Sequence, residues 1–167
     1  AYQRLFSRFK DGAELAKADL RAITKLIKPV GFYREKAKRI KQIARIIYGR
    51  YGGRVPESRE ELLKLPGVGP KTADIVLSVA FGKPEIAVDT HVEAVAKRLG
   101  VAEDTADYEA VKQALTRLVT GDDVFLVNAL FVKFGREICR KPRPRCSVCP
   151  LTKYCRYYAE LLRDRAV

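Results

Sequence analysis

The sequence predicts an all-α protein, and two observations support this. Apolar residues recur every three or four positions over several stretches, and no stretch shows the two-residue alternation of a β-strand. Gly and Pro residues stand between these stretches and separate them. A chain of 167 residues can bury a core in one domain or in two small ones.

The N-terminal part predicts three helices in order. Spaced apolar residues indicate an amphipathic helix over residues 13–27, which a Pro-Val-Gly turn ends. A second helix over residues 34–49 has one apolar stripe, and its opposite face carries Lys and Arg. A short third helix opens with the capping box Ser58-Arg59-Glu60-Glu61 and ends at Leu65.

A glycine-rich turn and a fourth helix follow directly. The glycines of Gly67-Val68-Gly69 can take positive φ, so the three residues predict a tight hairpin with bare amide groups. Pro70 suits the first position of the next helix. Because bare amides at a helix N-terminus bind anions, we expect Gly67, Val68 and Gly69 to hold a phosphate. Helix, hairpin and helix over about residues 58–81 resemble the helix–hairpin–helix element of DNA repair proteins.

The C-terminal half predicts three more helices. Asp89 or Thr90 caps the first of them, and the Gly that follows Leu99 ends it. The other two cover about residues 107–120 and 122–138. The last thirty residues are rich in Cys, Pro and Arg and are expected to be largely irregular.

The charge of the chain predicts a polyanionic partner. It carries 33 basic and 20 acidic residues, a formal net charge of +13. The excess is concentrated, since residues 25–54 hold ten Lys or Arg and one acid. Heat-adapted proteins also have Lys- and Arg-rich surfaces, but they usually balance Lys with Glu. We therefore expect a nucleic acid as the partner rather than a membrane surface.

Membrane and export features are absent from the sequence. No apolar run approaches the roughly 20 residues that a membrane span needs. No signal peptide opens the chain. We expect a cytoplasmic protein, associated with the nucleoid if the source is prokaryotic.

Four cysteines fall in one C-terminal window with the spacing C-x6-C-x2-C-x5-C: Cys139, Cys146, Cys149 and Cys155. Thiols concentrated in this way in a cytosolic protein indicate a metal centre rather than disulfides. Structural zinc is an alternative, although zinc sites more often pair two C-x2-C knuckles. The uneven spacing favours a four-cysteine iron–sulfur cluster over zinc.

A basic loop connects the first two cysteines. Its cations are Arg140, Lys141, Arg143 and Arg145, and two prolines stiffen it. Metal ligands at both ends would hold Lys141, Arg143 and Arg145 toward a phosphate backbone at a low entropic cost. The alternative is an ordinary solvated loop.

Three motifs in this order resemble the endonuclease III family of base-excision DNA glycosylases. They are the stretch Leu65–Lys71, the stretch Ala87–His91 and the cysteine window. The resemblance covers essentially the whole chain. It implies two helical domains around a DNA-binding cleft, with a [4Fe–4S] cluster in the second. We place the boundary at the Gly82-Lys83-Pro84 break, between a helical-barrel domain (1–83) and a cluster domain (84–167).

The chain also departs from the family, whose members normally begin a few dozen residues earlier. The expected extra stretch would supply an N-terminal helix of the cluster domain, the first helices of the barrel domain and a loop bearing a Gln. We therefore expect the barrel domain to be incomplete at its N-terminus.

The resemblance implies that Lys71 and Asp89 are the catalytic residues. Lys71 lies in the first turn of a helix, where the positive end of the dipole disfavours the ammonium form. Partial burial and nearby basic residues would disfavour that form further. A neutral Lys can form a Schiff base with the opened sugar. The alternative for Lys71 is a phosphate contact. Asp89 would stabilise positive charge on the sugar or transfer a proton, and its structural alternative is a helix cap.

Two further residues and one ion are implied as DNA contacts. Phe32 matches an apolar wedge that the family inserts into DNA, although a role in the core is the alternative. His91 matches a phosphate contact near the active site. The hairpin would bind its phosphate through a monovalent cation.

The implied function is bifunctional: removal of oxidised pyrimidines followed by abasic-site lyase cleavage of double-stranded DNA, by a monomer. A mismatch-specific uracil or thymine glycosylase is a second reading, which Lys71 disfavours. A non-catalytic or truncated DNA-binding module is a third, which the Lys71 and Asp89 pair disfavours. A redox role for the cluster is a fourth, and we expect the cluster to be chiefly structural.

Overall fold

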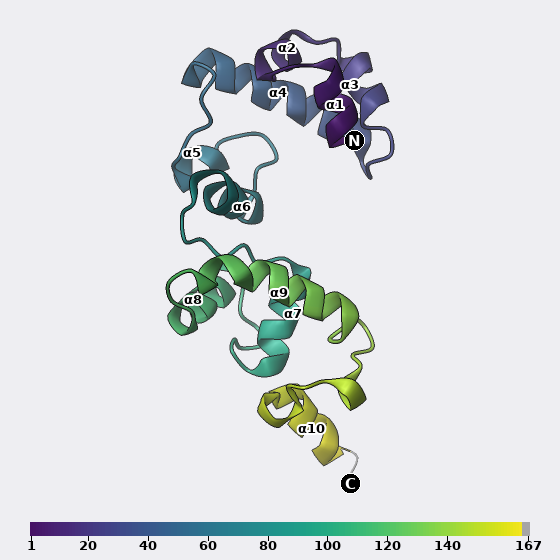
Figure 1. Ribbon diagram of the computed structural model, residues 1–167, viewed down its shortest axis with the longest axis vertical. Helices are drawn as coiled ribbons and strands as arrows, with labels where there is room; N and C mark the ends of the chain where they lie inside the picture. Colours follow the sequence, from purple (N-terminus) through teal and green to yellow (C-terminus); the bar gives the residue numbers. More distant parts are fainter. Residues whose placement is uncertain (165–167) are drawn as a thin grey trace. The chain divides into compact units, whose positions relative to one another are not determined.

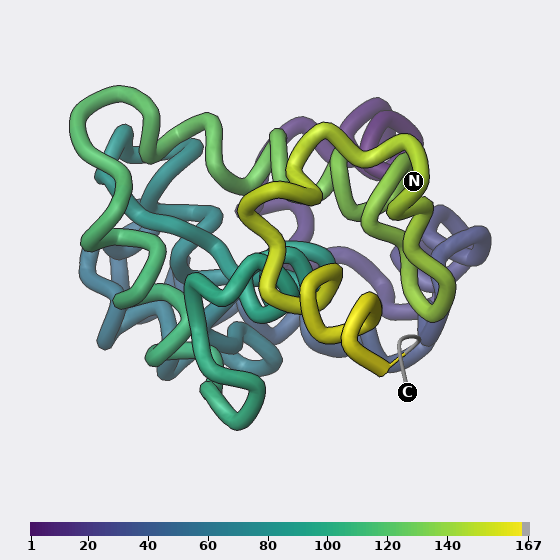
Figure 2. The backbone as a smooth tube through the Cα atoms, turned by 90° about the horizontal axis from the view of Figure 1, so that it is seen from below, coloured from purple at the N-terminus to yellow at the C-terminus, as the bar shows by residue number. Residues whose placement is uncertain are grey.

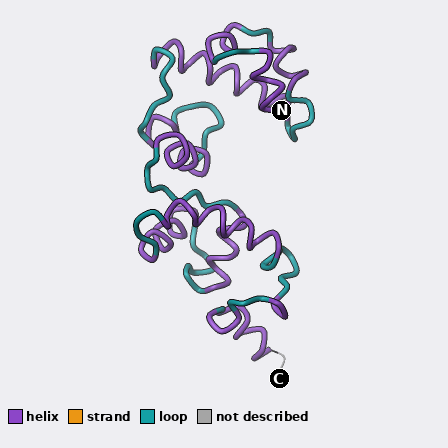
Figure 3. Tube along the Cα trace, viewed as in Figure 1, coloured by secondary structure: helices purple, strands orange, loops and turns teal. Residues whose placement is uncertain are grey.

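The computed structural model describes residues 1–164, and within them all regular structure is helical (Figures 1 and 3). The predicted all-α class is confirmed. None of the helices in this part of the chain is long and apolar enough to cross a bilayer.

The chain forms two compact units, which are described separately; the first comprises Ala1–Gly69 and the second begins at Pro70. The boundary differs from the predicted one after residue 83. Helix α6 (Pro70–Phe81) belongs to the second unit, where its Asp74 bonds Tyr108 and Lys112 of α8 (Tyr108–Leu118). These bonds tie α6 to the second unit, even though the Gly-Lys-Pro break follows α6 in the sequence.

The first unit contains five helices: α1 (Tyr2–Arg8), α2 (Gly12–Lys17), α3 (Leu20–Leu26), α4 (Tyr33–Tyr51) and α5 (Arg59–Leu63). Its core gathers apolar side chains from the first four: Leu5, Phe9, Leu15, Ala18, Ile23, Ile27, Ala37 and Ala44. Helix α4 matches the predicted 34–49 helix.

The single helix predicted over residues 13–27 is wrong. The chain breaks at Ala18, whose backbone is extended and whose side chain is buried, and α3 restarts after Asp19. Because apolar residues continue through the break, the helical period alone does not reveal it.

The prediction of a capping box at the start of α5 is also wrong, because its side chains do not make the capping bonds. Ser58 is the N-cap residue, but its side chain makes no capping bond. Glu61 instead accepts hydrogen bonds from Lys64 and Tyr51, so it does not reach back to the Ser58 amide.

The second unit contains α6, α7 (Thr90–Leu99), α8, α9 (Asp123–Glu137), α10 (Arg156–Asp164) and the short 3₁₀ turns η1 (Cys146–Val148) and η2 (Thr152–Tyr154). Its core lies among α7, α8, α9 and the segment before α7: Ile86, Val88, Val92, Ala96, Ala102, Val111, Leu115, Val124 and Val127. The backbone can be followed in Figure 2 through the yellow cysteine loops into α10. The expectation of a largely irregular end is thus wrong for α10.

Candidate active site and cysteine centre

Lys71 and Asp89 line the same pocket in the second unit. Lys71 is the second residue of α6, and Asp89 is the N-cap of α7. The pocket is open to solvent and has a volume of about 400 Å³, and its walls also include His91, Glu93 and Arg136. Two elements therefore bring an amine and a carboxylate to one cavity.

Asp89 caps α7, which is the structural role that the sequence offered as an alternative to catalysis. Its Oδ1 accepts hydrogen bonds from the amides of His91 at 2.8 Å and Val92 at 2.9 Å. Both bonds end on the same oxygen, so Oδ2 takes no part in capping. The cap holds the side chain in one direction and leaves the second oxygen for other chemistry.

Lys71 is exposed, so the chain by itself does not supply the partial burial that would favour a neutral amine. The buried face of α6 consists of Ala73, Asp74 and Leu77. Lys71 lies in the first turn of α6, before the first of these buried residues, and its side chain is exposed.

His91 is held by close packing of α7 on α9. A Cβ atom at Gly135 would lie 2.9 Å from the His91 Cβ and 3.0 Å from its Nδ1, so only glycine fits there. The neighbouring Arg136 lines the pocket. The sequence analysis missed Arg136 and also Tyr108, another lining residue, because only tertiary packing brings α8 and α9 to this cavity.

The glycine-rich hairpin belongs to the first unit. Gly67 has φ of 76°, and a Cβ there would lie 2.5 Å from Arg39 Cδ, so a side chain at this position is doubly disfavoured. Gly69 does not have a positive φ. Val68 donates its amide to the Leu65 carbonyl at 3.1 Å, so this amide serves the turn rather than a ligand.

Arg39 of α4 contacts the hairpin, whereas the sequence indicated only that it belongs to the basic face of its helix. It lies against Gly67 and brings positive charge to the turn. No local signal distinguishes Arg39 from the other cations of α4, since the contact joins residues far apart in the chain. The monovalent cation stays a prediction.

Phe32 lies in the turn before α4. Its side chain is 87% exposed, which rules out the core role. Its φ of 55° is left-handed, a conformation that a bulky residue seldom adopts and that costs energy. An exposed aromatic ring on a strained backbone agrees with a surface function.

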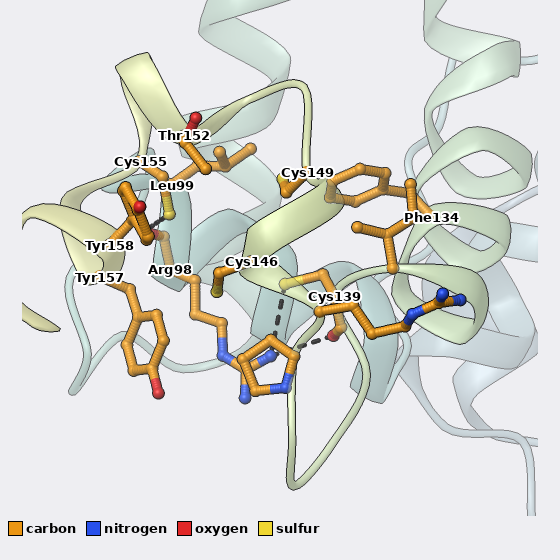
Figure 4. A pocket seen from close by; sticks show the side chains of 13 residues that line it. Arg98, Leu99, Phe134, Cys139, Cys146, Cys149, Thr152, Cys155, Tyr157 and Tyr158 are labelled. Atoms are coloured by element: carbon orange, nitrogen blue, oxygen red, sulfur yellow. Dashed lines mark hydrogen bonds between the residues drawn. The ribbon is translucent and has the colours of Figure 1, made fainter.

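All four cysteines line one cavity in the second unit (Figure 4). None of them forms a disulfide. Apolar and aromatic side chains complete the walls, among them Leu99, Phe134 and Tyr157. Within the described residues no cluster of His, Cys, Asp or Glu is arranged to hold a single metal ion.

Arg98, near the end of α7, organises this centre. Its Nη1 donates to the Cys139 carbonyl at 3.0 Å, to the Cys139 Sγ at 3.3 Å and to the Arg140 carbonyl at 3.2 Å. The Cys155 thiol donates to the Arg98 carbonyl at 3.2 Å. Arg98 thus fixes two cysteines and the first residue of the basic loop, a role that no sequence motif indicated.

The Cys146 thiol is partly buried and lines the cavity with the other three cysteines. Burial raises the pKa of this thiol, and the neighbouring cysteines Cys155, Cys139 and Cys149 raise it further. Four thiolates in one cavity would repel each other unless a metal compensates their charge.

The cations of the basic loop are exposed, with Lys141, Arg143 and Arg145 all at the surface.

Comparison with known proteins agrees with this architecture. A family model for HhH-GPD superfamily base excision DNA repair proteins matches residues 1–120. Endonuclease III of Thermotoga maritima is 48% identical over 158 residues, 95% of this chain and 74% of that protein. Endonuclease III of Bacillus subtilis is 45% identical, over 91% of this chain and 69% of that protein.

Solved structures are similar as well. A trapped endonuclease III–DNA covalent intermediate superposes with a TM-score of 0.89 at 38% identity, over 97% of this chain and 76% of that one. A thermostable thymine-DNA glycosylase superposes with a TM-score of 0.86 at 32% identity, over 95% of this chain and 75% of that one. The chain thus spans about three quarters of the length of these proteins.

The family match and the high identity over most of the chain settle the assignment. This protein belongs to the endonuclease III family, and it is a DNA-binding base-excision-repair glycosylase and abasic-site lyase.

Proposed function

We propose that Lys71 is the nucleophile of this glycosylase and lyase and that Asp89 assists it. The observation that carries the proposal is their position on one pocket, from two different elements. A pure DNA-binding module needs neither an amine nor a capping carboxylate with a spare oxygen at that place.

The reaction begins when the neutral Lys71 Nζ attacks C1′ of a nucleotide turned out of the stack. The C1′–N bond breaks, and the base leaves with a proton. The sugar ring opens to an imine with Lys71, a C2′ proton is lost, and the 3′ phosphate leaves. Water then hydrolyses the imine and frees Lys71. Asp89 stabilises the positive charge that develops on the sugar.

Bound DNA completes this site. Lys71 is exposed in the free protein, so the burial that favours a neutral amine comes from the substrate that covers the pocket. Phe32 fills the step left by the flipped base. The Gly67 and Gly69 amides with Arg39, and His91 with the loop cations Lys141, Arg143 and Arg145, contact phosphates.

We infer that Cys139, Cys146, Cys149 and Cys155 hold a [4Fe–4S] cluster, as the family does. Zinc with sulfur ligands at about 2.3 Å would need the sulfurs about 3.8 Å apart. No group of that kind occurs among residues 1–164, whereas all four cysteines line one cavity, and this supports a larger centre. A cluster held by Cys139 and Cys146 would fix both ends of the basic loop between them.

The substrate we propose is a duplex with an oxidised pyrimidine, acted on by a monomer. The test is a panel of duplexes that carry an oxidised pyrimidine, a G·T or G·U mismatch, or an abasic site, with base release and strand cleavage measured separately. Release of oxidised pyrimidines followed by cleavage supports the proposal. Release from mismatches without cleavage would contradict it and favour a function like that of the thymine-DNA glycosylase neighbour.

A further inference from the structure

The segment before Asp89 is buried and is held by side chains from two helices. Ile86, Ala87 and Val88 are each at most 5% exposed. The Asn128 Nδ2 of α9 donates to the Ala87 carbonyl at 2.7 Å. The Val88 amide donates to the Tyr108 hydroxyl oxygen of α8 at 3.2 Å. The backbone that leads into Asp89 therefore takes its position from Asn128 and Tyr108.

Tyr108 is in turn held by a fully buried carboxylate. Its hydroxyl donates to Asp74 Oδ2 at 2.7 Å, and the Asp74 side chain is 0% exposed. The direction of this bond is fixed, because an ionised carboxylate only accepts. Lys112 Nζ lies 3.0 Å from the same oxygen and also pairs with Glu85, so the charge of Asp74 is compensated.

Asp74 stands on the helix that carries Lys71. The two residues are three positions apart in α6, about one helical turn. The Asp74–Tyr108 bond therefore joins the first turn of α6 to the segment that ends in Asp89. Tyr108 also lines the pocket that Lys71 and Asp89 share.

We propose that Asp74 and Tyr108 are positioning residues for base excision: they set the distance and direction between Lys71 and Asp89. The inference rests on the roles proposed for those two residues. Buried, satisfied polar networks resist distortion, because an unmade bond leaves a buried group without its partner. A packed apolar pair would hold the helices together at a lower desolvation cost, but it would not fix the Val88 amide.

The test compares Tyr108→Phe with a matched variant in the other unit, Tyr51→Phe. Tyr51 also donates to a carboxylate, that of Glu61, from a half-buried position. In the full chain we expect Tyr108→Phe to slow single-turnover base release about tenfold or more with DNA affinity unchanged, since small misplacements of reacting groups are costly. Tyr51→Phe is expected to keep the wild-type rate. We expect it to lower the melting temperature by about as much as Tyr108→Phe does.

A second pair of variants keeps the test decisive if Tyr108→Phe folds poorly. Asp74→Asn retains an acceptor for the Tyr108 hydroxyl, whereas Asp74→Leu does not. We expect Asp74→Asn to stay within about threefold of the wild-type rate and Asp74→Leu to fall about tenfold or more. Equal rates for the two Asp74 variants, or a wild-type rate for Tyr108→Phe, would overturn the inference.

Lys71→Ala separates this inference from the proposed function. If Lys71→Ala still forms a covalent adduct with DNA on borohydride reduction, the role of Lys71 fails, and the inference fails with it. If the adduct is lost while Tyr108→Phe keeps the wild-type rate, the inference alone fails.

Discussion

The two ends of helix α7 carry two different sites. At its N-terminal end Asp89 caps the helix, and it lines an open pocket of about 400 Å³ together with an exposed Lys71. At its C-terminal end Arg98 holds the backbone and sulfur of Cys139 beside the cavity that the four cysteines line. The charges match the helix dipole, with the carboxylate at the positive end and the guanidinium at the negative end.

The difference reflects what each site must bind. If the proposed roles of Lys71 and Asp89 hold, their pocket has to admit a nucleotide, and Lys71 is exposed there. The cavity at Arg98 brings four thiols together among apolar and aromatic walls, which suits a permanent cofactor. Variants at the two ends should therefore affect different measurements.

The largest effect is expected from Asp89→Asn. Asn caps helices as well as Asp, so the fold should persist while the charge is lost. We expect single-turnover base release to fall about a hundredfold or more, and cleavage of a preformed abasic site to fall less. Asp107→Asn is the matched control, since Asp107 caps α8 through the Ala110 amide at 2.9 Å. Equal losses on both substrates would mean that Asp89 is only a cap.

Cys146→Ala should affect the other end. We expect loss of bound iron and of the visible absorbance of the sulfur–iron bonds, with weaker DNA binding as the basic loop loses its order. Iron analysis and DNA titration measure both, and Ser147→Ala is the neighbouring control. A wild-type chain that holds one zinc ion and lacks visible absorbance would contradict the cluster.

Gly135→Ala should disturb the catalytic end selectively. The added methyl group would lie 2.9 Å from the His91 Cβ, and overpacking of this kind costs about 1–3 kcal/mol. We expect a lower melting temperature and slower base release, with iron content unchanged. Gly49→Ala in α4 is the control, because no atom lies within 4 Å of its added Cβ. Iron loss in Gly135→Ala would show that the two ends are not independent.

The smallest effect is expected from the pair Arg143→Gln and Arg145→Gln. If each contacts a phosphate, the slope of log K against log salt should fall by about 0.9 for each contact, whatever the DNA sequence. Binding titrations at several salt concentrations measure this slope, with Lys17→Gln on the exposed face of α2 as the control. A loss confined to one DNA sequence would contradict phosphate contacts.

Local signals allowed some parts of this molecule to be predicted from the sequence. Pro70 and the cap at Asp89 mark the starts of α6 and α7 with residue types that act within one turn. The cysteine spacing likewise lies within one short window. The break at Ala18 was missed because a buried apolar residue continues the helical pattern through it.

Other parts depend on contacts between distant segments. Arg98 meets Cys139 across 41 positions, and Tyr108 meets Asp74 across 34. Asp74 reads in the sequence as a polar residue in an apolar helix, and only tertiary structure supplies its partners Tyr108 and Lys112. Arg136 and Arg39 resemble other surface cations until the fold places one at the pocket and the other at the hairpin.

The most direct test of the account is borohydride reduction of this chain mixed with duplex DNA that carries one abasic site. We expect a covalent adduct from the wild-type chain and from the control Lys17→Ala, and none from Lys71→Ala although it still binds the duplex. An adduct from Lys71→Ala at the wild-type yield would contradict the assignment of Lys71 as the nucleophile.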